Sequence, residues 1–344
     1  KKQAAEQDDD DDDGDDNIEN LDLSTRPQQK HQKHHTLKLI TSERKVKLFS
    51  PNQHLIEQFE ESIREMLKNT PWHGKNRFNS FAPVRTGVYA QWLVDGRDYM
   101  WNVSRAISMA KDVIYIHDWW LSPELYMRRP ACISQKWRLD RLLQRKAAEG
   151  VKIFVIVYRN VEAAIPIDSE HTKFSLLNLH PNIFIQRSPH QFKKNQFFFA
   201  HHEKICIVDH DIAFIGGIDL CFGRWDTPQH PVADDKPTGF EPGCDLPKDA
   251  EHCQLFPGKD YSNPRERDFF KLTDPYEEMY DRSRTPRMPW HDVGMQVVGQ
   301  PARDLTRHFV QRWNYVRRGR KPTRPTPFLL PPPDCRPEEM EAVG

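Results

Sequence analysis

Short apolar runs alternate with amphipathic segments over most of this 344-residue chain, and this alternation limits the fold more than any other feature. Residues 151–158 (VKIFVIVY) are almost all apolar, and several are β-branched, which is typical of a buried strand. The preceding segment carries Leu139, Leu142 and Leu143 at helical spacing and ends before Gly150. Strands that alternate with helices predict an α/β domain, with a mainly parallel or mixed sheet flanked by helices.

The same patterns predict the other elements of this domain. Pro301 opens the last predicted helix, at a position where the N–H that proline lacks has no helical partner. We expect strands at 88–94, 113–117, 151–158, 183–186, 204–208, 212–215 and 293–298, and helices at 52–69, 97–111, 136–149, 174–179 and 301–315.

Three segments lie outside this pattern. Residues 1–43 contain an acidic run and then a Gln/Lys/His-rich stretch, so we expect a disordered linker that has little apolar surface to bury. Residues 226–268 are rich in Pro, Gly and Asp and predict a long surface loop, a kind of loop that often has a function. Residues 331–344 are expected to form a Pro-rich tail or a linker between lobes. Because the chain begins with Lys1 and stops in this stretch, we expect it to be a fragment of a longer protein.

Composition limits the cellular setting. Apolar residues make up 37% of the chain and charged residues 29%, as in a water-soluble globular protein. There is no run of about 18 apolar residues, the length that a membrane span needs, and the acidic start does not resemble a secretory signal. The six cysteines form no CxxC pair, and Cys244, His252 and Cys253 lack the spacing of a zinc site. We therefore expect a cytoplasmic protein with reduced thiols and with neither a metal nor another cofactor.

The segment 201–226 (HHEKICIVDHDIAFIGGIDLCFGRWD) carries the most chemical information. His202 and Lys204 lie two residues apart at the start of a predicted strand, so their side chains are expected on the same face. An imidazole can attack a phosphodiester or protonate its leaving group, and an ammonium group can stabilise charge on the phosphoryl oxygens. The pair therefore predicts phosphodiester chemistry. His201 is a local rival, but no lysine follows it at that spacing.

The residues after this pair complete a longer pattern. Asp209 gives the spacing H-x-K-x4-D, although its position past the strand makes a direct catalytic role less natural. Gly216 and Gly217 follow the next predicted strand, where a glycine pair indicates a tight turn or a close approach of backbone. A phosphate pocket would use either arrangement.

The whole segment resembles the H-x-K-x4-D-x6-G signature of the phospholipase D superfamily. Its continuation GGIDL at 216–220 resembles the eukaryotic branch, found in fungi and animals, that hydrolyses phosphatidylcholine. Four other segments carry the same resemblance: RFNSFAP at 77–83, IHDWWLSPE at 116–124, RMPWHDVG at 287–294 and PARDL at 301–305. The resemblance implies that residues 44–330 form the first catalytic lobe of such an enzyme, an α/β lobe of the phospholipase D type.

In that family, two such motifs from two similar lobes meet at one site. One histidine attacks phosphorus and forms a phosphohistidine, the other protonates the departing headgroup, and no catalytic metal is needed. Water or an alcohol then releases phosphatidic acid or a phosphatidyl alcohol. The resemblance makes His202 either the nucleophile or its acid partner, with Lys204 on the phosphate. It groups the site residues as catalytic (His202, Lys204, Asp209) and substrate-binding (Gly216, Gly217, Asp219).

A second motif of this kind is absent from the sequence. Apart from His202, three histidines (His31, His73 and His171) have a lysine two residues later, but none of them is followed by an aspartate at the spacing of Asp209. We therefore expect the chain to hold half of an active site, to need a second lobe as its partner, and to be inactive by itself unless two copies pair.

The sequence allows two interpretations for each of several other residues. Trp119 and Trp120 either line a lipid entrance or belong to the core, where aromatic residues after a buried strand more often lie. Asp118 and Glu124 either support the catalytic residues or form caps and ion pairs. A basic cluster near the end of the chain also has two interpretations. It either binds anionic lipid such as a phosphoinositide, with an attraction of about 1 kcal/mol per charge, or it belongs to a solvated linker. Its members are Arg317, Arg318, Arg320, Lys321 and Arg324.

The resulting hypothesis is a peripheral membrane phosphodiesterase that hydrolyses phosphatidylcholine-type lipids, with a phospholipid membrane and no nucleic acid as its partner. Two alternatives stay open: a nuclease-like phosphodiesterase that pairs two single-motif chains, and a non-catalytic lipid-binding protein. The GGID sequence and the Trp119-Trp120 pair weigh against the nuclease.

Overall fold

The computed structural model describes most of the chain, in two compact units that comprise residues 1–84 and 85–344. The acidic run, the cysteines at 244 and 253 and most of the predicted tail lie outside the described residues. The described residues are 34–41, 45–70, 73–131, 134–160, 167–189, 200–235, 254–261 and 273–332.

The first unit is a β-hairpin followed by a helix, β1 (His35–Ile40), β2 (Lys45–Ser50) and α1 (Gln53–Asn69). The helix is confirmed almost to the residue, and the Asn52 side chain caps it by accepting a hydrogen bond from the N–H of Leu55. The prediction that residues 1–43 form only a linker is wrong for β1. Leu37 pairs with Leu48 across the antiparallel hairpin, and the apolar residues alternate with polar ones. The short Lys- and Thr-containing strand has too little apolar character to be detected without its partner.

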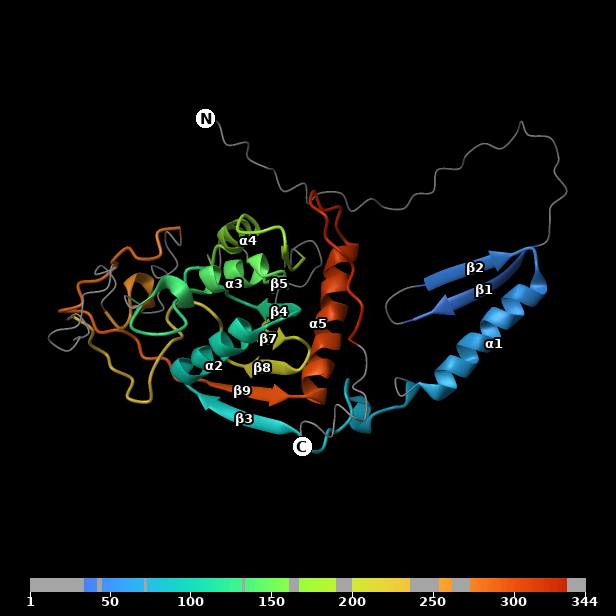
Figure 1. The fold of residues 1–344 in the computed structure, drawn as a ribbon, viewed down its shortest axis with the longest axis horizontal. Coiled ribbons are helices and arrows are strands. Elements are labelled where there is room, and N and C mark those ends of the chain that lie inside the picture. Colours follow the sequence, from blue (N-terminus) through green and yellow to red (C-terminus); the bar gives the residue numbers. More distant parts are fainter. Residues whose placement is uncertain are drawn as a thin grey trace, which may run out of the picture. The chain divides into compact units, whose positions relative to one another are not determined.

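The second unit is built on one mixed seven-stranded sheet with the order β3-β9-β8-β7-β4-β5-β6 (Figure 1). The neighbours β4, β5 and β6 are parallel, and the other pairs are antiparallel. This confirms the predicted α/β fold with a mixed sheet. The strands are β3 (Tyr89–Val94), β4 (Val113–Asp118), β5 (Lys152–Val157), β6 (Ile183–Arg187), β7 (Ile205–Val208), β8 (Ile212–Gly216) and β9 (Val293–Val298).

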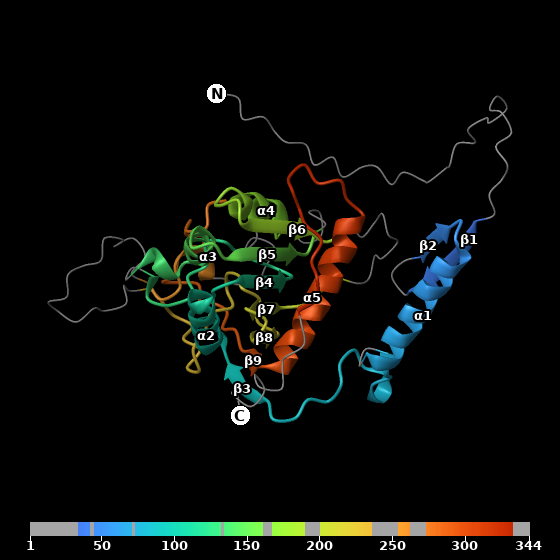
Figure 2. The ribbon, with the colours of Figure 1, turned by 45° about the vertical axis from the view of Figure 1, so that its right-hand side comes forward.

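Helices cover both faces of this sheet. On one face, α2 (Gly96–Met109) and α3 (Leu139–Ala148) pack against each other and the strands. On the other face, α5 (Gln300–Arg318) crosses the strands and contacts β4, β6, β7, β8 and β9 (Figure 2). A further helix, α4 (Ser169–Leu177), packs on β6. It begins earlier than the sequence predicts, because the Asp168 side chain accepts a hydrogen bond from the N–H of His171 and starts the helix there.

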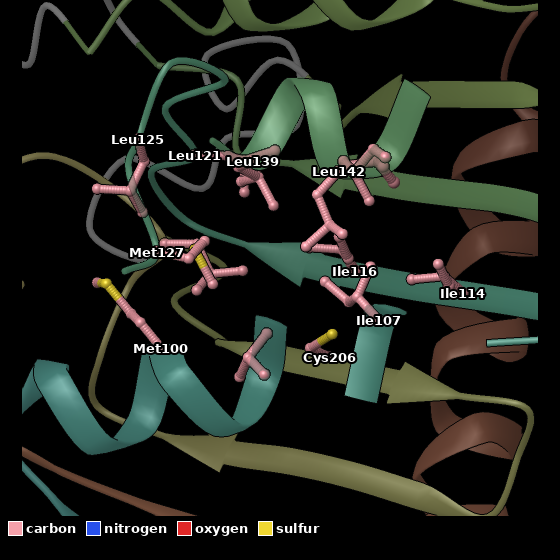
Figure 3. Packing of buried hydrophobic residues seen from close by; sticks show 14 of the residues in the cluster. Met100, Ile107, Ile114, Ile116, Leu121, Leu125, Met127, Leu139, Leu142 and Cys206 are labelled. Atoms are coloured by element: carbon pink, nitrogen blue, oxygen red, sulfur yellow. The ribbon is translucent and has the colours of Figure 1, made fainter. Parts of the chain in front are cut away.

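The strand pleat divides the core into two layers. Ile114 and Ile116 of β4 face Ile107 of α2 and Leu142 of α3, as Figure 3 shows. Their neighbour Tyr115 points the other way, into the smaller cluster under α5. The sheet is therefore buried on both faces, which accounts for the nearly continuous apolar runs of its central strands.

The predicted long loop at 226–268 is only partly described, as residues 226–235 and 254–261. Residues 254–261 are packed on the fold, whereas half of residues 226–235 are exposed. Phe256 is fully buried, and the Asp234 carboxylate accepts hydrogen bonds from the N–H groups of Leu255 and Phe256. None of the helices in the described ranges is both long and apolar enough to cross a membrane.

The sheet topology brings several chain segments to one edge. The carboxyl end of β4 pairs with the amino end of β7, His117 beside Ile205, and the carboxyl end of β8 pairs with the amino end of β9, Gly216 beside Gly294. We call this edge the active edge, because the described residues singled out by the sequence, except Asp209, Glu124 and the basic cluster, lie along it.

Candidate active site

His202 and Lys204 lie at the active edge, immediately before β7. Lys204 Nζ is 3.4 Å from Nε2 of His202, so the two groups stand side by side, as their spacing predicts. The imidazole is exposed, whereas Lys204 is only 4% exposed. A reactant can therefore reach the histidine while the ammonium group stays fixed beneath it.

The buried Asp219 holds this lysine. Its Oδ1 lies 2.7 Å from Lys204 Nζ and accepts a hydrogen bond from the N–H of Trp120, and its Oδ2 lies 3.9 Å from Nε of Arg224. The Arg224 guanidinium in turn packs over the ring of Trp290 at 4.0 Å. The sequence analysis placed Asp219 among the substrate-binding residues, but with 3% of its surface exposed it acts here as the counter-ion of Lys204.

A second buried carboxylate, Asp118, lies behind this pair at the end of β4. Its Oδ2 accepts a hydrogen bond from the N–H of Leu220, which ties the loop after β8 to β4. Burial, together with the neighbouring Asp219 carboxylate, raises the pKa of Asp118 well above its ordinary range. The protonated form of Asp118 is thus favoured beside the Asp219 carboxylate that pairs with Lys204.

The electrostatics of the pair favour a neutral imidazole. Partial burial lowers the pKa of His202 from its ordinary value, and the Lys204 and Arg224 charges lower this pKa further, against an opposing effect of Asp219. At neutral pH the imidazole therefore keeps a lone pair with which it can attack an electrophile. The arrangement offers a nucleophile beside a fixed cation, which suits displacement at a phosphodiester.

Comparison with known proteins agrees with this geometry. The family model described as Phospholipase D matches residues 106–240, which include β4, β7, His202, Lys204 and Asp219. Phospholipase D1 of Schizosaccharomyces pombe is 54% identical over 308 residues, which are 89% of this chain and 22% of that protein. Phospholipase D1 of Saccharomyces cerevisiae is 53% identical over 307 residues, 89% of this chain and 18% of that protein. The chain belongs to the phospholipase D family.

The matched region is only a part of each of these relatives. The chain spans about a fifth of the length of these two fungal relatives. Among solved structures, Nuc of Salmonella typhimurium, a phospholipase D family member, matches with a TM-score of 0.35 and 12% identity over 66% of this chain and 95% of that one.

The two tryptophans of the phospholipase D segment IHDWW have different positions. The ring of Trp119 lies 4.9 Å from the ring of His202 and 5.6 Å from Lys204 Nζ, and it stacks on Tyr158. Trp120 is 5% exposed, with the Arg224 guanidinium 5.2 Å from its ring centre. Trp119 therefore forms part of the wall beside the imidazole, whereas Trp120 belongs to the core.

The glycine pair of the phospholipase D signature serves packing. A Cβ on Gly216 would lie 2.5 Å from the carbonyl oxygen of Val293, and a Cβ on Gly217 would lie 2.2 Å from Oδ1 of Asp292. Gly216 has no room for a side chain because the backbone at the start of β9 comes so close, and a Cβ at Gly217 would displace the Asp292 side chain. The close backbone approach expected from the sequence is present, but its partner is this neighbouring segment, and these contacts give neither glycine a role in a phosphate pocket.

Asp209, the last residue of the signature, lies at the opposite end of β7. Its carboxylate accepts three hydrogen bonds of 2.8–2.9 Å from the N–H groups of Lys111, Asp112 and Val113, which link α2 to β4. Asp209 lies five positions after Lys204 along a nearly extended chain, which corresponds to about 17 Å. The grouping of Asp209 with the catalytic residues is not supported by these contacts, because all of them bind backbone.

The members of the basic cluster at the end of α5 have different environments. The Arg317 guanidinium donates hydrogen bonds to the carbonyl oxygens of Thr326 and Arg320, and Arg320 donates one to the carbonyl of Ser188. These two arginines hold the following segment on the fold. Arg318, Lys321 and Arg324 are exposed, so a lipid surface could reach them, although the Arg324 guanidinium also donates hydrogen bonds to Leu177 and Asn178.

Sequence reasoning missed the residues on the other side of the active edge. Glu203 lies among His117, His201 and His308, and although burial opposes it, these histidines lower the pKa of Glu203 well below its usual range. Burial lowers the pKa of His117 to about 4, so that imidazole is neutral. Glu124 is elsewhere, in an ion pair with His171. Only the alternation of Glu203 with His202 and Lys204 could have indicated that Glu203 faces away from them.

Proposed function

We propose that this chain supplies one half of a phospholipase D active site, in which His202 is the nucleophile that attacks the phosphorus of phosphatidylcholine-type lipids. The observation that carries the proposal is the exposed, neutral imidazole of His202 held 3.4 Å from the buried ammonium of Lys204. Family membership supports the reaction type. The substrate follows from the resemblance to the phosphatidylcholine-hydrolysing branch.

The first chemical step transfers the phosphatidyl group to the enzyme. A lone pair of the imidazole forms a bond to phosphorus, and the bond from phosphorus to the choline oxygen breaks, so that the electron pair leaves with that oxygen. The departing oxygen takes a proton from the second histidine, which a second lobe provides. Lys204, fixed by Asp219, stabilises the charge that builds on the phosphoryl oxygens.

The second step regenerates the imidazole. Water attacks the phosphohistidine, its proton passes to the second histidine, and the bond from phosphorus to nitrogen breaks, which releases phosphatidic acid. Asp118 and Arg224 take no direct part. They are positioning residues: Arg224 lies against Asp219, and Asp118 keeps the loop after β8 in place.

Action on a lipid requires contact with a membrane surface. The exposed Arg318 and Lys321 would attract anionic headgroups, at about 1 kcal/mol per charge near the surface. We therefore propose peripheral attachment of a cytoplasmic protein, with an anionic phosphoinositide as the attracting lipid.

A chimera tests the function in a complete enzyme. The matching 308 residues of the S. pombe phospholipase D1 are replaced by this chain, and choline release from phosphatidylcholine vesicles is measured. We expect turnover from the chimera and none above background from its His202→Ala variant, while His54→Ala in the exposed part of α1 leaves turnover unchanged. An active chimera whose His202→Ala variant keeps its rate would refute the proposal, and so would a folded chimera that cleaves DNA but no lipid.

A further inference from the structure

Three histidines surround one carboxylate oxygen of Glu203 on the α5 side of the sheet, and these four residues come from three parts of the second unit. Oε2 of Glu203 lies 3.1 Å from Nδ1 of His117, 3.1 Å from Nε2 of His201 and 2.8 Å from Nε2 of His308. We call these four residues the histidine cluster. The rings of His117 and His201 stack with their centres 4.5 Å apart, so two imidazoles approach the carboxylate together.

The cluster is separated from the catalytic pair by the strand pleat. Successive side chains of this segment point to opposite faces of the sheet. Lys204 points to the same face as Cys206, which packs in the core layer under α2 and α3. Glu203 points to the other face, that of Ile205 and the smaller core layer, where it contacts His308 of α5. The reacting groups and the histidine cluster therefore lie back to back on the same short segment.

Hydrogen bonding does not account for the whole cluster. Both ring nitrogens of His117 and Nε2 of His201 are buried and have no aligned hydrogen-bond partner within the described residues, although two of these atoms lie 3.1 Å from Glu203. His117 is 1% exposed, so its ring has no access to water. A buried polar atom without an aligned hydrogen bond destabilises the fold, and a ligand at the centre of the cluster would offset this.

The donor set and its spacing fit a metal ion. The ligand atoms of His117, His201 and Glu203 all lie within 4.8 Å of one another. A tetrahedral zinc ion, with bonds of about 2.0–2.1 Å, holds neighbouring ligand atoms about 3.3 Å apart. The three separations from the Glu203 oxygen, 2.8–3.1 Å, need to widen by only a few tenths of an ångström, whereas His308 lies outside the compact group of three and has to turn toward it to become the fourth ligand. Imidazole nitrogens and a carboxylate are ligands that Zn²⁺ accepts.

We propose that His117, His201, Glu203 and His308 form a binding site for one divalent transition-metal ion, of the Zn²⁺ class, on the α5 side of the active edge. The ion would join β4 and α5 to the segment that carries His202, and it would touch none of the reacting groups. This site is independent of the proposed reaction. It differs from the metal-free expectation because that expectation considered cysteine spacing and the family's reaction, whereas these ligands are brought together by the fold.

The surroundings predict how tightly the ion is held. The half-buried Arg312 guanidinium is close enough to interact electrostatically with both Glu203 and His117, and it would repel a cation. We therefore expect an exchangeable ion rather than the permanently bound zinc of a structural site.

The test measures binding of Zn²⁺ alone to the purified 344-residue chain, by competition with a chromogenic chelator, and of Co²⁺ by its visible absorption, which reports four-coordinate geometry. We expect one ion per chain. The variants His308→Gln and His117→Gln should each weaken binding about 100-fold or more, since loss of an outer-shell partner alone already costs 10–100-fold. Thermal unfolding in the absence of metal establishes that each variant is folded, and His201→Gln replaces either one that is not.

Three controls separate this site from other histidines. His171→Gln alters a half-buried histidine paired with Glu124 elsewhere and should leave the affinity unchanged. His291→Gln removes a ligand from a second group, Asp95, His230 and His291. A double variant, His34→Gln with His35→Gln, removes two neighbouring histidines of the first unit. The proposal is overturned if no ion binds to the wild-type chain, if the cluster variants bind as the wild type does, or if only a control variant loses the ion.

Discussion

The two halves of one sequence signature lie at the two ends of β7 and have different roles. At the amino end, Lys204 and Asp219 form a buried ion pair under an exposed histidine. At the carboxyl end, Asp209 is half-buried and accepts three hydrogen bonds from backbone N–H groups. The amino end buries charge, which is costly, and gains a fixed cation beside a nucleophile. The carboxyl end gains connection between α2 and β4.

This difference shows how the spacing H-x-K-x4-D is to be understood. The histidine and lysine must be two residues apart so that both face the reactant. The aspartate must lie beyond the strand, because there its carboxylate reaches the turn between α2 and β4. The motif therefore combines a chemical requirement with a folding requirement, and each can be removed without the other.

The largest expected effect is on catalysis at the amino end. His202→Ala in the chimera should lower turnover at least about 10⁴-fold, the scale seen when a nucleophile is removed. Its midpoint of thermal unfolding should change little, because an exposed side chain is lost. Choline release and thermal unfolding are measured on the same preparation. A large fall in the midpoint would show that His202 has a structural role, which would weaken the comparison.

The next effect separates the lysine's charge from its packing. Lys204→Met should lower kcat about 10²–10³-fold and destabilise the fold by about 3 kcal/mol, because Asp219 is left buried without its partner. Adding Asp219→Leu should restore most of the stability and none of the activity. Urea unfolding of the single and double variants measures this. Equal stability of the Lys204→Met variant and the wild type would contradict the buried ion pair.

A smaller effect is expected at the carboxyl end. Asp209→Ala should lower the free energy of unfolding by about 2–3 kcal/mol, because three hydrogen bonds to a carboxylate are lost. Asp209→Asn, which keeps an acceptor and tolerates the positive φ of 51° at this position, should cost less. In the folded protein kcat should stay within about twofold of the wild type. A loss of kcat without a loss of stability would place Asp209 in the catalytic machinery.

The smallest effect is on pH dependence. Only neutral His202 attacks, so kcat/KM should fall as the pH drops through the pKa of His202, which lies below its ordinary value of 6.5. Lys204→Met removes a positive neighbour and should move this pKa upward. An NMR titration of the ¹⁵N-labelled imidazole in the chain and the variant measures both, with Lys38→Met in β1 as a control. A wild-type pKa above 6.5, or a downward move in Lys204→Met, would contradict the electrostatic argument.

Much of this fold could be predicted because its strong elements are local. The apolar runs of β4 and β5 and the spacing of α1 and α5 carry their own signal, and all four elements lie where expected. Strand β1 could not be predicted, since it depends on pairing with β2 and shows weak alternation by itself. The start of α4 was missed because it depends on the side chain of Asp168, in an unusual backbone conformation.

The site could be predicted only where residues close in sequence form it. The spacing of His202 and Lys204 gives their common face, but nothing local places Asp219 beneath the lysine or makes Gly217 a neighbour of Asp292. The histidine cluster joins Glu203 to a residue 105 positions later. Contacts of this kind follow from the order of strands in the sheet, which the sequence analysis did not resolve.

The most direct test of the account is to trap the covalent intermediate. The chimera is mixed with phosphatidylcholine labelled with ³²P in its phosphate, quenched in alkali within a turnover, digested and mapped. We predict that the label lies on the peptide that contains His202, that Asp209→Ala retains it, and that Lys204→Met lowers its amount. Label on a histidine of the second lobe, with none on His202, would contradict the central claim that the amino end of β7 carries the nucleophile.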